Sequence, residues 1–252
     1  MCLVAFSWKN HKEYPLVISA NRDEFFERPT APLHQWDNEI IAGKDLRGGG
    51  TWMGFHPNRR WSLLTNFRDF KKMGHGKISR GKLVQDFLED SISPLDYLKE
   101  IEKNQDWYEG FNLLVSDGEQ VFYFSNFGKG IEEIQPGIHA LSNGLLNEPW
   151  PKTSLAKQQL QEILDQEITH SSLLQILKSK ETYPLEQLPT TGVPEELEVA
   201  LSAQLIRTNG NYGTRSASSV LWYNADLVSI RERTFDWDER IFKESSVEIQ
   251  TY

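Results

Sequence analysis

Strand-like and helical stretches occur in blocks along this chain instead of alternating one by one. Short apolar runs typical of strands lie at 3–8, 16–20, 51–55 and 61–65, then at 111–115, 121–124 and 138–141, and finally at 213–222 and 227–235. Apolar residues at helical spacing occupy 79–101 and 153–177. Grouped elements favour antiparallel sheets with segregated helices over a doubly wound parallel sheet. We therefore predict one α+β domain that spans residues 1–252.

Turn signals divide the strand blocks into hairpins. The polar run 9–13 joins the first two apolar runs, and Pro57 with Asn58 forms the tip of a second hairpin. The dipeptide Asp117-Gly118 is a strong hairpin turn between the runs at 111–115 and 121–124.

The helical blocks carry their own start and stop signals. Ser79 is placed to cap a first helix, and Pro94 to open a second. The later block divides into two helices near Thr169. Residues 29–32 and 181–195 contain several prolines and are expected to be loops.

The overall charge restricts the partners of the protein. The formal net charge of -9 disfavours nucleic acid and anionic membrane surfaces, since their binders concentrate positive charge. The cationic stretch 68–82 is expected to be a solvated loop that enters a helix. No apolar run approaches the roughly 20 residues that membrane insertion requires. The expected partner is a small-molecule substrate or an amphipathic ligand, and the sequence leaves the oligomeric state open.

The chain contains a single cysteine, Cys2. It cannot form an intrachain disulfide, and residues 1–20 lack the features of a secretory signal, so we expect a cytoplasmic protein. A cysteine here could simply be a small buried apolar residue. Alternatively, aminopeptidases remove Met1 before a small side chain, which would give Cys2 a free α-amine. That amine has a reference pKa of about 7.7 to 8.0 and could serve as the general base for its own thiol.

The histidines show no spacing typical of a metal site or a catalytic pair. They are His11, His34, His56, His75, His139 and His170, scattered mostly in predicted loops. The chain has no cysteine and histidine pattern for zinc, no G-x-S-x-G motif, no P-loop and no dinucleotide fingerprint. The triplet 48–50 of glycines is expected to mark a tight turn. We therefore predict neither a metal nor a cofactor.

The dipeptide Arg22-Asp23 could assist a cysteine nucleophile. Arg22 could lower the thiol pKa and bind a substrate carboxylate or oxyanion, and Asp23 could position the α-amine. Alternatively, Asp23 caps a helical turn over residues 24–27. Because neighbouring residues on a strand face opposite sides, both side chains can face Cys2 only if the chain turns between them.

Two asparagines and a late arginine complete the set of candidates. Asn66 and Asn143 could each present an amide N–H to an oxyanion, or each could be a turn residue. Arg215 could add a second cation to the site, or it could lie on a strand face.

Taken together, short motifs along the chain resemble those of a known family. In order they are Met1-Cys2, Asn21-Arg22-Asp23-Glu24, Arg28-Pro29-Thr30, Gly49-Gly50-Thr51-Trp52-Met53-Gly54, Thr65-Asn66-Phe67-Arg68, Ser79-Arg80-Gly81, Leu141-Ser142-Asn143, Pro149-Trp150-Pro151-Lys152 and Gly213-Thr214-Arg215-Ser216. The joint pattern, from residue 1 to about 235, resembles the NRDE family, which includes the transport and Golgi organisation protein 2 group.

The resemblance implies a fold and a site. The family looks like a member of the N-terminal nucleophile (Ntn) hydrolases, whose fold is a four-layer αββα sandwich. Cysteine enzymes of that superfamily cleave amides with an N-terminal cysteine, an arginine, an aspartate, two asparagines and a late arginine. By order along the chain, the similar residues here are Cys2, Arg22, Asp23, Asn66, Asn143 and Arg215. One departure is that Arg22 and Asp23 are adjacent, whereas those enzymes separate the two by two residues.

Two functions follow from these patterns. The first is an amidohydrolase or acyltransferase that acts on non-peptide C–N bonds with Cys2 as the nucleophile. The second is a non-catalytic carrier that binds haem, acyl-CoA or another amphipathic molecule in the same pocket, since members of the family have been linked to haem and lipid metabolism. The aromatic residues near the motifs motivate the carrier, and they are Phe25, Phe26, Trp52, Phe55, Phe67 and Trp150.

Overall fold

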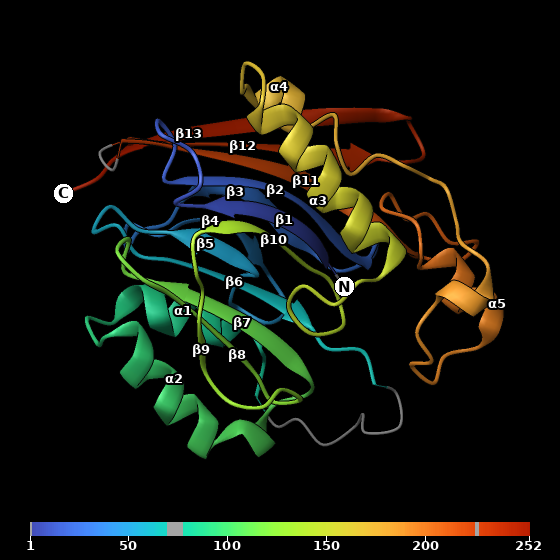
Figure 1. Cartoon of the computed structure of the whole chain (residues 1–252), viewed down its shortest axis with the longest axis horizontal. Coiled ribbons are helices and arrows are strands. Elements are labelled where there is room, and N and C mark those ends of the chain that lie inside the picture. Colours follow the sequence, from blue (N-terminus) through green and yellow to red (C-terminus); the bar gives the residue numbers. More distant parts are fainter. Residues whose placement is uncertain (1, 70–77, 225–226) are drawn as a thin grey trace.

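The computed structural model describes residues 2–69, 78–224 and 227–252. In this part of the chain the strands form two antiparallel sheets (Figure 1). In spatial order, the first sheet contains β10 (Gly137–Leu141), β1 (Cys2–Trp8), β2 (Leu16–Phe25), β11 (Tyr212–Tyr223), β12 (Leu227–Asp236) and β13 (Ile241–Gln250). The second contains β3 (Thr30–Gln35), β4 (Ile41–Asp45), β5 (Met53–Phe55), β6 (Trp61–Asn66), β7 (Phe111–Ser116), β8 (Val121–Ser125) and β9 (Glu132–Glu133).

Helices cover the outer face of each sheet. They are α1 (Gly81–Glu89), α2 (Pro94–Lys103), α3 (Pro151–Leu164), α4 (His170–Leu173) and α5 (Glu195–Ala200), with short 3-10 turns at Gln105–Trp107 and Leu185–Gln187. In Figure 1, α1 and α2 lie against the second sheet, α3 and α4 lie against the first, and α5 lies to one side. No helix among the described residues combines the length and the apolar character needed to cross a bilayer.

Three apolar cores hold the layers together. The central core lies between the two sheets and includes the fully buried Trp8, Trp61 and Trp222. A second core joins α1 and α2 to the strands β4, β6, β7 and β8, and a third joins α3 and α4 to β1, β2 and β11. Each sheet therefore buries both faces, which confirms the predicted α+β fold with four αββα layers.

The N-terminal hairpin brings two candidate residues together. Strands β1 and β2 pair with Cys2 directly opposite Arg22, and β2 runs five residues beyond the predicted stretch 16–20 to include residues 21–25. Directly paired residues in an antiparallel sheet share a face. Cys2 and Arg22 therefore face the second sheet, and the neighbouring Asp23 faces the helix layer.

Several expectations about local structure were wrong. The predicted loop 29–32 is part of β3, an edge strand whose register shifts between Ala31 and His34, and an edge position tolerates Pro32 because no neighbour needs its N–H. Ser79 is not the cap of α1, because the cap residue is Arg80 and it makes no side-chain cap bond. The sequence also predicts a turn at 224–226, between the runs 213–222 and 227–235, and this turn lies partly outside the described residues.

The sequence patterns missed several elements, among them β13 and α5. Strand β13 is mostly exposed and polar, so it lacks the apolar alternation that marks a half-buried strand. Helix α5 is a short segment that starts at Glu195, the last residue of the predicted loop 181–195. Neither segment contains a periodic pattern of apolar residues that is long enough to predict a strand or a helix.

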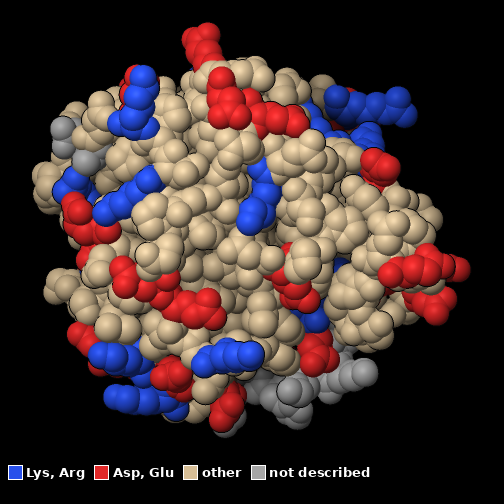
Figure 2. Space-filling model, viewed as in Figure 1, with Lys and Arg blue, Asp and Glu red and all other residues tan. Residues whose placement is uncertain are grey.

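Charges of both signs are interspersed over the surface drawn in Figure 2, where no large basic patch is visible. The cationic stretch 68–82 differs from the predicted solvated loop in its described part. Arg68 is 6% exposed and Arg80 is half-buried, while residues 70–77 lie outside the description.

Candidate functional site

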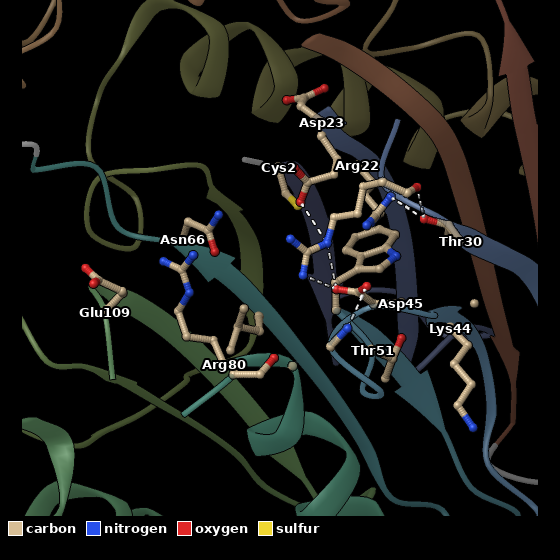
Figure 3. Close-up of a pocket in the computed structure, with 18 of the residues that line it drawn as sticks. Cys2, Arg22, Asp23, Thr30, Lys44, Asp45, Thr51, Asn66, Arg80 and Glu109 are labelled. Carbon is tan, nitrogen blue, oxygen red and sulfur yellow. Dashed lines mark hydrogen bonds and ion pairs between the residues drawn. The ribbon is translucent and has the colours of Figure 1, made fainter. Parts of the chain in front are cut away.

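A polar cavity of about 390 Å³ opens at the end of the sandwich where β1 begins. Its wall is built from the start of β1, the end of β2, the loop that follows β4, the end of β6 and the start of α1. Figure 3 shows the side chains that line it. Segments far apart in the sequence therefore converge on one chamber.

Cys2 contributes its thiol to this cavity, although the residue is only 6% exposed. Burial raises the pKa of the Cys2 thiol and the Asp23 carboxylate adds to the rise, whereas Arg22 and a hydrogen bond from the Asp23 backbone N–H oppose it. The Cys2 carbonyl accepts a hydrogen bond of 3.0 Å from Ser142 Oγ. The Cys2 backbone is thus held in place, and the raised pKa keeps the resting thiol protonated.

Arg22 lies beside the thiol on the same face of the sheet, as its register with Cys2 requires. Its Nη1 donates a long bond of 3.4 Å to Thr30 Oγ1. No carboxylate in the described part of the chain forms an ion pair with it. The guanidinium is therefore able to bind an additional anionic group.

Asp23 is 1% exposed and, in Figure 3, its carboxylate points away from Arg22. It accepts a bond of 2.7 Å from Thr214 Oγ1. Burial raises the pKa of Asp23, while the buried ammonium of Lys152 lowers it. Asp23 belongs to β2 and is not the cap of a helical turn, and its side chain does not share the face of the thiol.

The two asparagines play different structural parts. Asn66, at the end of β6, lines the cavity. Asn143 is fully buried and is not among the residues that line it. Its Nδ2 donates a bond of 2.8 Å to the Asn66 carbonyl, and its own carbonyl accepts from the Arg68 N–H at 2.8 Å. Asn143 therefore holds the backbone that carries Asn66.

Arg215 lies at the irregularity of β11 between Thr214 and Ser216. Its Nη1 donates to the carbonyls of Phe25, Phe26 and Arg28 at 2.6 to 3.0 Å. It lines a second cavity of about 370 Å³ that shares a wall with the first. Arg215 thus fixes the turn after β2.

The sequence analysis missed several charged groups of the site. Arg80 and Glu109 line the main cavity, as do Arg28 and Asp45, which form a salt bridge of 2.6 Å. The only sequence signal for Arg80 is the motif Ser79-Arg80-Gly81, which contributes to the family resemblance. None of the described histidines lines the cavity, and His75 lies outside the description.

A buried charge network lies on the helix side of the first sheet. Lys152, from the first turn of α3, is 2% exposed and donates a bond of 2.9 Å to the Leu201 carbonyl. Burial and Arg68 lower the pKa of Lys152 to about 8, although Asp23 and Glu198 act against the shift. Arg68 and Glu198 form a buried ion pair that ties α5 to the segment after β6. Within this network, Lys152 is the group that acts on Asp23, and it stabilises the charged carboxylate.

An αββα sandwich whose first strand begins with a cavity-lining cysteine is a protein of the Ntn hydrolase-like fold class. Comparison with known proteins refines this assignment. The model of the family Transport and Golgi organisation 2 matches residues 1–237, so the chain belongs to that family, and the predicted family membership is confirmed.

Individual proteins show the same relationship. The chain is 30% identical to the human Transport and Golgi organization protein 2 homolog, over 96% of this chain and 98% of that protein. It is also 30% identical to the mouse homolog, over 93% of each. Among solved structures, it is similar to an N-acylethanolamine-hydrolyzing acid amidase ortholog from Caenorhabditis elegans, at 11% identity and a TM-score of 0.48 over 87% of this chain and 92% of that chain.

Proposed function

We propose that the protein is an amidohydrolase or acyltransferase that acts on non-peptide amide C–N bonds, with Cys2 as the nucleophile after Met1 has been removed. One observation carries the proposal. The only thiol of the chain lies on the wall of a polar cavity opposite Arg22, and none of the described histidines lines that cavity.

The buried thiol needs a proton acceptor before it can attack. Burial raises the pKa of Cys2, so the thiolate is scarce at neutral pH. The α-amine of a processed Cys2 has a reference pKa of about 7.7 to 8.0 and lies on the same residue. In this proposal the amine takes the proton, and the carboxylate of Asp23 orients the amine.

The reaction then proceeds in two steps. The sulfur forms a bond to the carbonyl carbon while the thiol proton moves to the α-amine, and the C–N bond breaks as that proton is passed to the leaving nitrogen. The product of this step is a thioester on Cys2 and a free amine. Water, or an alternative acceptor nucleophile in acyl transfer, attacks the thioester, releases the acyl group and restores the thiol.

The negative oxygen formed during attack requires hydrogen-bond donors. Asn66 lines the cavity and is assigned this part, with Arg22 as the neighbouring positive charge. Asn143 acts as a positioning residue, because it is buried and bonded to the Asn66 backbone. Arg215 likewise acts through the turn that it binds.

The intact mass of protein isolated from its native host tests the proposal. We expect a chain that lacks Met1 and that gains the mass of one acyl group on incubation with p-nitrophenyl butyrate. Cys2→Ala should also lose Met1 but should gain no acyl group, because the alanine keeps the small side chain that permits processing. Equal labelling of the wild-type and Cys2→Ala proteins would exclude Cys2 as the nucleophile, and retention of Met1 would exclude the α-amine as its base.

The competing hypothesis is a non-catalytic carrier for haem, acyl-CoA or a similar ligand. Of the aromatic residues that motivated it, Trp52 lines the main cavity, whereas Phe55 packs in the central core and Phe67 stacks on Phe127 at 4.3 Å. Charged groups make up much of the wall, which favours a reaction on a polar substrate. Saturable binding of haem or acyl-CoA without acylation of Cys2 would favour the carrier.

A further inference from the structure

The arginines near the cavity differ in their partners. Arg28 donates two bonds to Asp45 Oδ2, at 2.9 and 2.6 Å, and Arg215 is bound to three carbonyls. Arg22 and Arg80 have no carboxylate within ion-pair distance among the described residues. These two guanidinium groups therefore have no direct ion pair among the described residues, although the carboxylates of Glu109 and Glu24 act on Arg80 from a longer distance.

Arg80 projects into the cavity from the wall opposite to Cys2. Its Nη1 donates a bond of 2.8 Å to the Gly110 carbonyl, and in Figure 3 its guanidinium is directed towards Asn66. Glu109 and Glu24 also line the cavity and act on Arg80 electrostatically. Because the carbonyl uses only part of the guanidinium, most of its N–H donors remain available.

Three glycines explain how Arg80 is held there. A Cβ atom on Gly50 would lie 2.4 Å from the carbonyl carbon and oxygen of Gly81, and a Cβ atom on Gly48 would lie 2.9 Å from Ser79 Oγ. A Cβ atom on Gly81 would in turn lie 3.1 Å from the Thr51 carbonyl oxygen. The loop after β4 and the start of α1 thus pack backbone against backbone, which fixes the origin of the Arg80 side chain.

Burial makes an incompletely compensated charge on Arg80 costly. Burial lowers the pKa of Arg80, and the carboxylates of Glu109 and Glu24 oppose that change. A guanidinium remains protonated under these conditions, so its charge must be compensated inside a partly dehydrated cavity. A planar guanidinium with free donors matches a carboxylate or a phosphate, which accept two parallel N–H bonds.

We propose that Arg80 is a specificity residue that binds an anionic oxygen group, a carboxylate or a phosphate, of the molecule that reacts at Cys2. The substrate class is then an amide that carries such a group on the side of the cavity opposite to the thiol. This substrate class rests on the proposed function, whereas the anion site itself does not.

Alkylation of Cys2 tests the site without any enzymatic reaction. Because the chain has one cysteine, the mass gained on alkylation reports on Cys2 alone. The reagents are N-iodoacetyl-glycine, N-iodoacetyl-β-alanine and N-iodoacetyl-O-phosphoethanolamine, each compared with the neutral N-iodoacetyl-glycinamide. Rates are measured at pH ~8.5, near the reference pKa of a thiol, and each is divided by the rate with free cysteine.

We expect at least one anionic reagent to react about tenfold faster than the neutral reagent, the factor that one charge-assisted hydrogen bond supplies. The carboxylate and phosphate reagents show which group the site prefers. Arg80→Gln should abolish the preference, and Arg80→Lys should keep a part of it because it retains the charge but not the planar fork. Arg47→Gln is the matched control, since Arg47 is exposed on the adjacent loop and does not line the cavity.

The proposal is overturned if no anionic reagent is preferred, or if Arg80→Gln, still folded by its thermal unfolding curve, keeps the preference. An equal loss in Arg47→Gln would assign the effect to general electrostatics and would also overturn it. If Arg80→Gln fails to fold, an unreduced preference in Arg80→Lys counts against a bidentate site. Failure of the proposed function is seen separately, as absent acylation in wild-type protein that still discriminates between these reagents.

Discussion

The glycine triplet before Thr51 supports a quantitative prediction about how the cavity is built. Gly49 and Gly50 are adjacent but meet different constraints. Gly49 has a φ of +77°, and no described atom lies within 4 Å of a Cβ added there. A Cβ added to Gly50 would lie 2.4 Å from two backbone atoms of Gly81 and 2.9 Å from the Lys82 nitrogen. Gly49→Ala therefore tests backbone conformation alone, and Gly50→Ala tests the close approach of two segments.

The two costs follow from these distances. A left-handed alanine costs about 1 kcal/mol, so Gly49→Ala should lower the free energy of unfolding by that amount. In Gly50→Ala, the start of α1 must move by roughly 1 Å to restore van der Waals contact, and overpacking of this kind costs about 3 kcal/mol. The atoms in the way belong to the backbone, so no side-chain rotation relieves the clash.

Thermal unfolding followed by circular dichroism measures the difference. At this chain length, each kcal/mol shifts Tm by about 2 to 4 °C, so Gly49→Ala should lose about 3 °C and Gly50→Ala about 9 °C. Gly50→Ala should also reduce the preference of Cys2 for anionic alkylating reagents, because Arg80 moves with α1. A Tm for Gly50→Ala equal to or above that of Gly49→Ala would refute the reasoning, since steric contact would then contribute nothing.

Three further predictions concern buried polar groups. Glu198→Leu should lower the free energy of unfolding, measured by urea denaturation, by about 3 to 5 kcal/mol because it leaves Arg68 charged and buried. The double variant with Arg68→Leu should lose less stability than Glu198→Leu alone. A larger loss in the double variant would contradict this reasoning. His170 binds two serine hydroxyls, and burial with Arg231 lowers its pKa to about 4. In the unfolded chain this histidine has a reference pKa of about 6.5, so between pH ~4 and ~6.5 the unfolded state binds more protons than the folded state. The stability of the wild-type protein should therefore fall from pH ~6.5 towards ~4 more steeply than that of His170→Gln. Parallel pH profiles of Tm would exclude this contribution. Tyr212 has a buried hydroxyl without a hydrogen-bond partner among the described residues. Tyr212→Phe should therefore leave the free energy of unfolding unchanged or raise it by up to ~1 kcal/mol. A clear loss of stability in the urea assay would instead reveal a hydrogen bond at that hydroxyl.

Much of the fold could be predicted because strong local patterns have a single good solution. The runs at 3–8 and 16–20 are apolar apart from Ser7 and Ser19, and they pair as the predicted hairpin of β1 and β2. Helix α2 begins at Pro94, and Thr169 caps α4, both where the sequence signals place them. Edge strands β3 and β13 could not be predicted because they face solvent and need no apolar alternation.

For the site, the sequence by itself determined the nucleophile candidate and the dipeptide Arg22-Asp23 that could assist it, but not which of these two side chains shares its face. A single cysteine at the start of a strand, and an arginine seven residues into the next, meet through hairpin register alone. Only the tertiary structure decided which of the other candidates reach the cavity. Asn143 and Arg215 are occupied by the carbonyls of distant segments, while Arg80 reaches the cavity because glycine loops pack closely there. The physical reason is that a polar side chain takes its role from the donors and acceptors around it, and segments far apart in the sequence supply them.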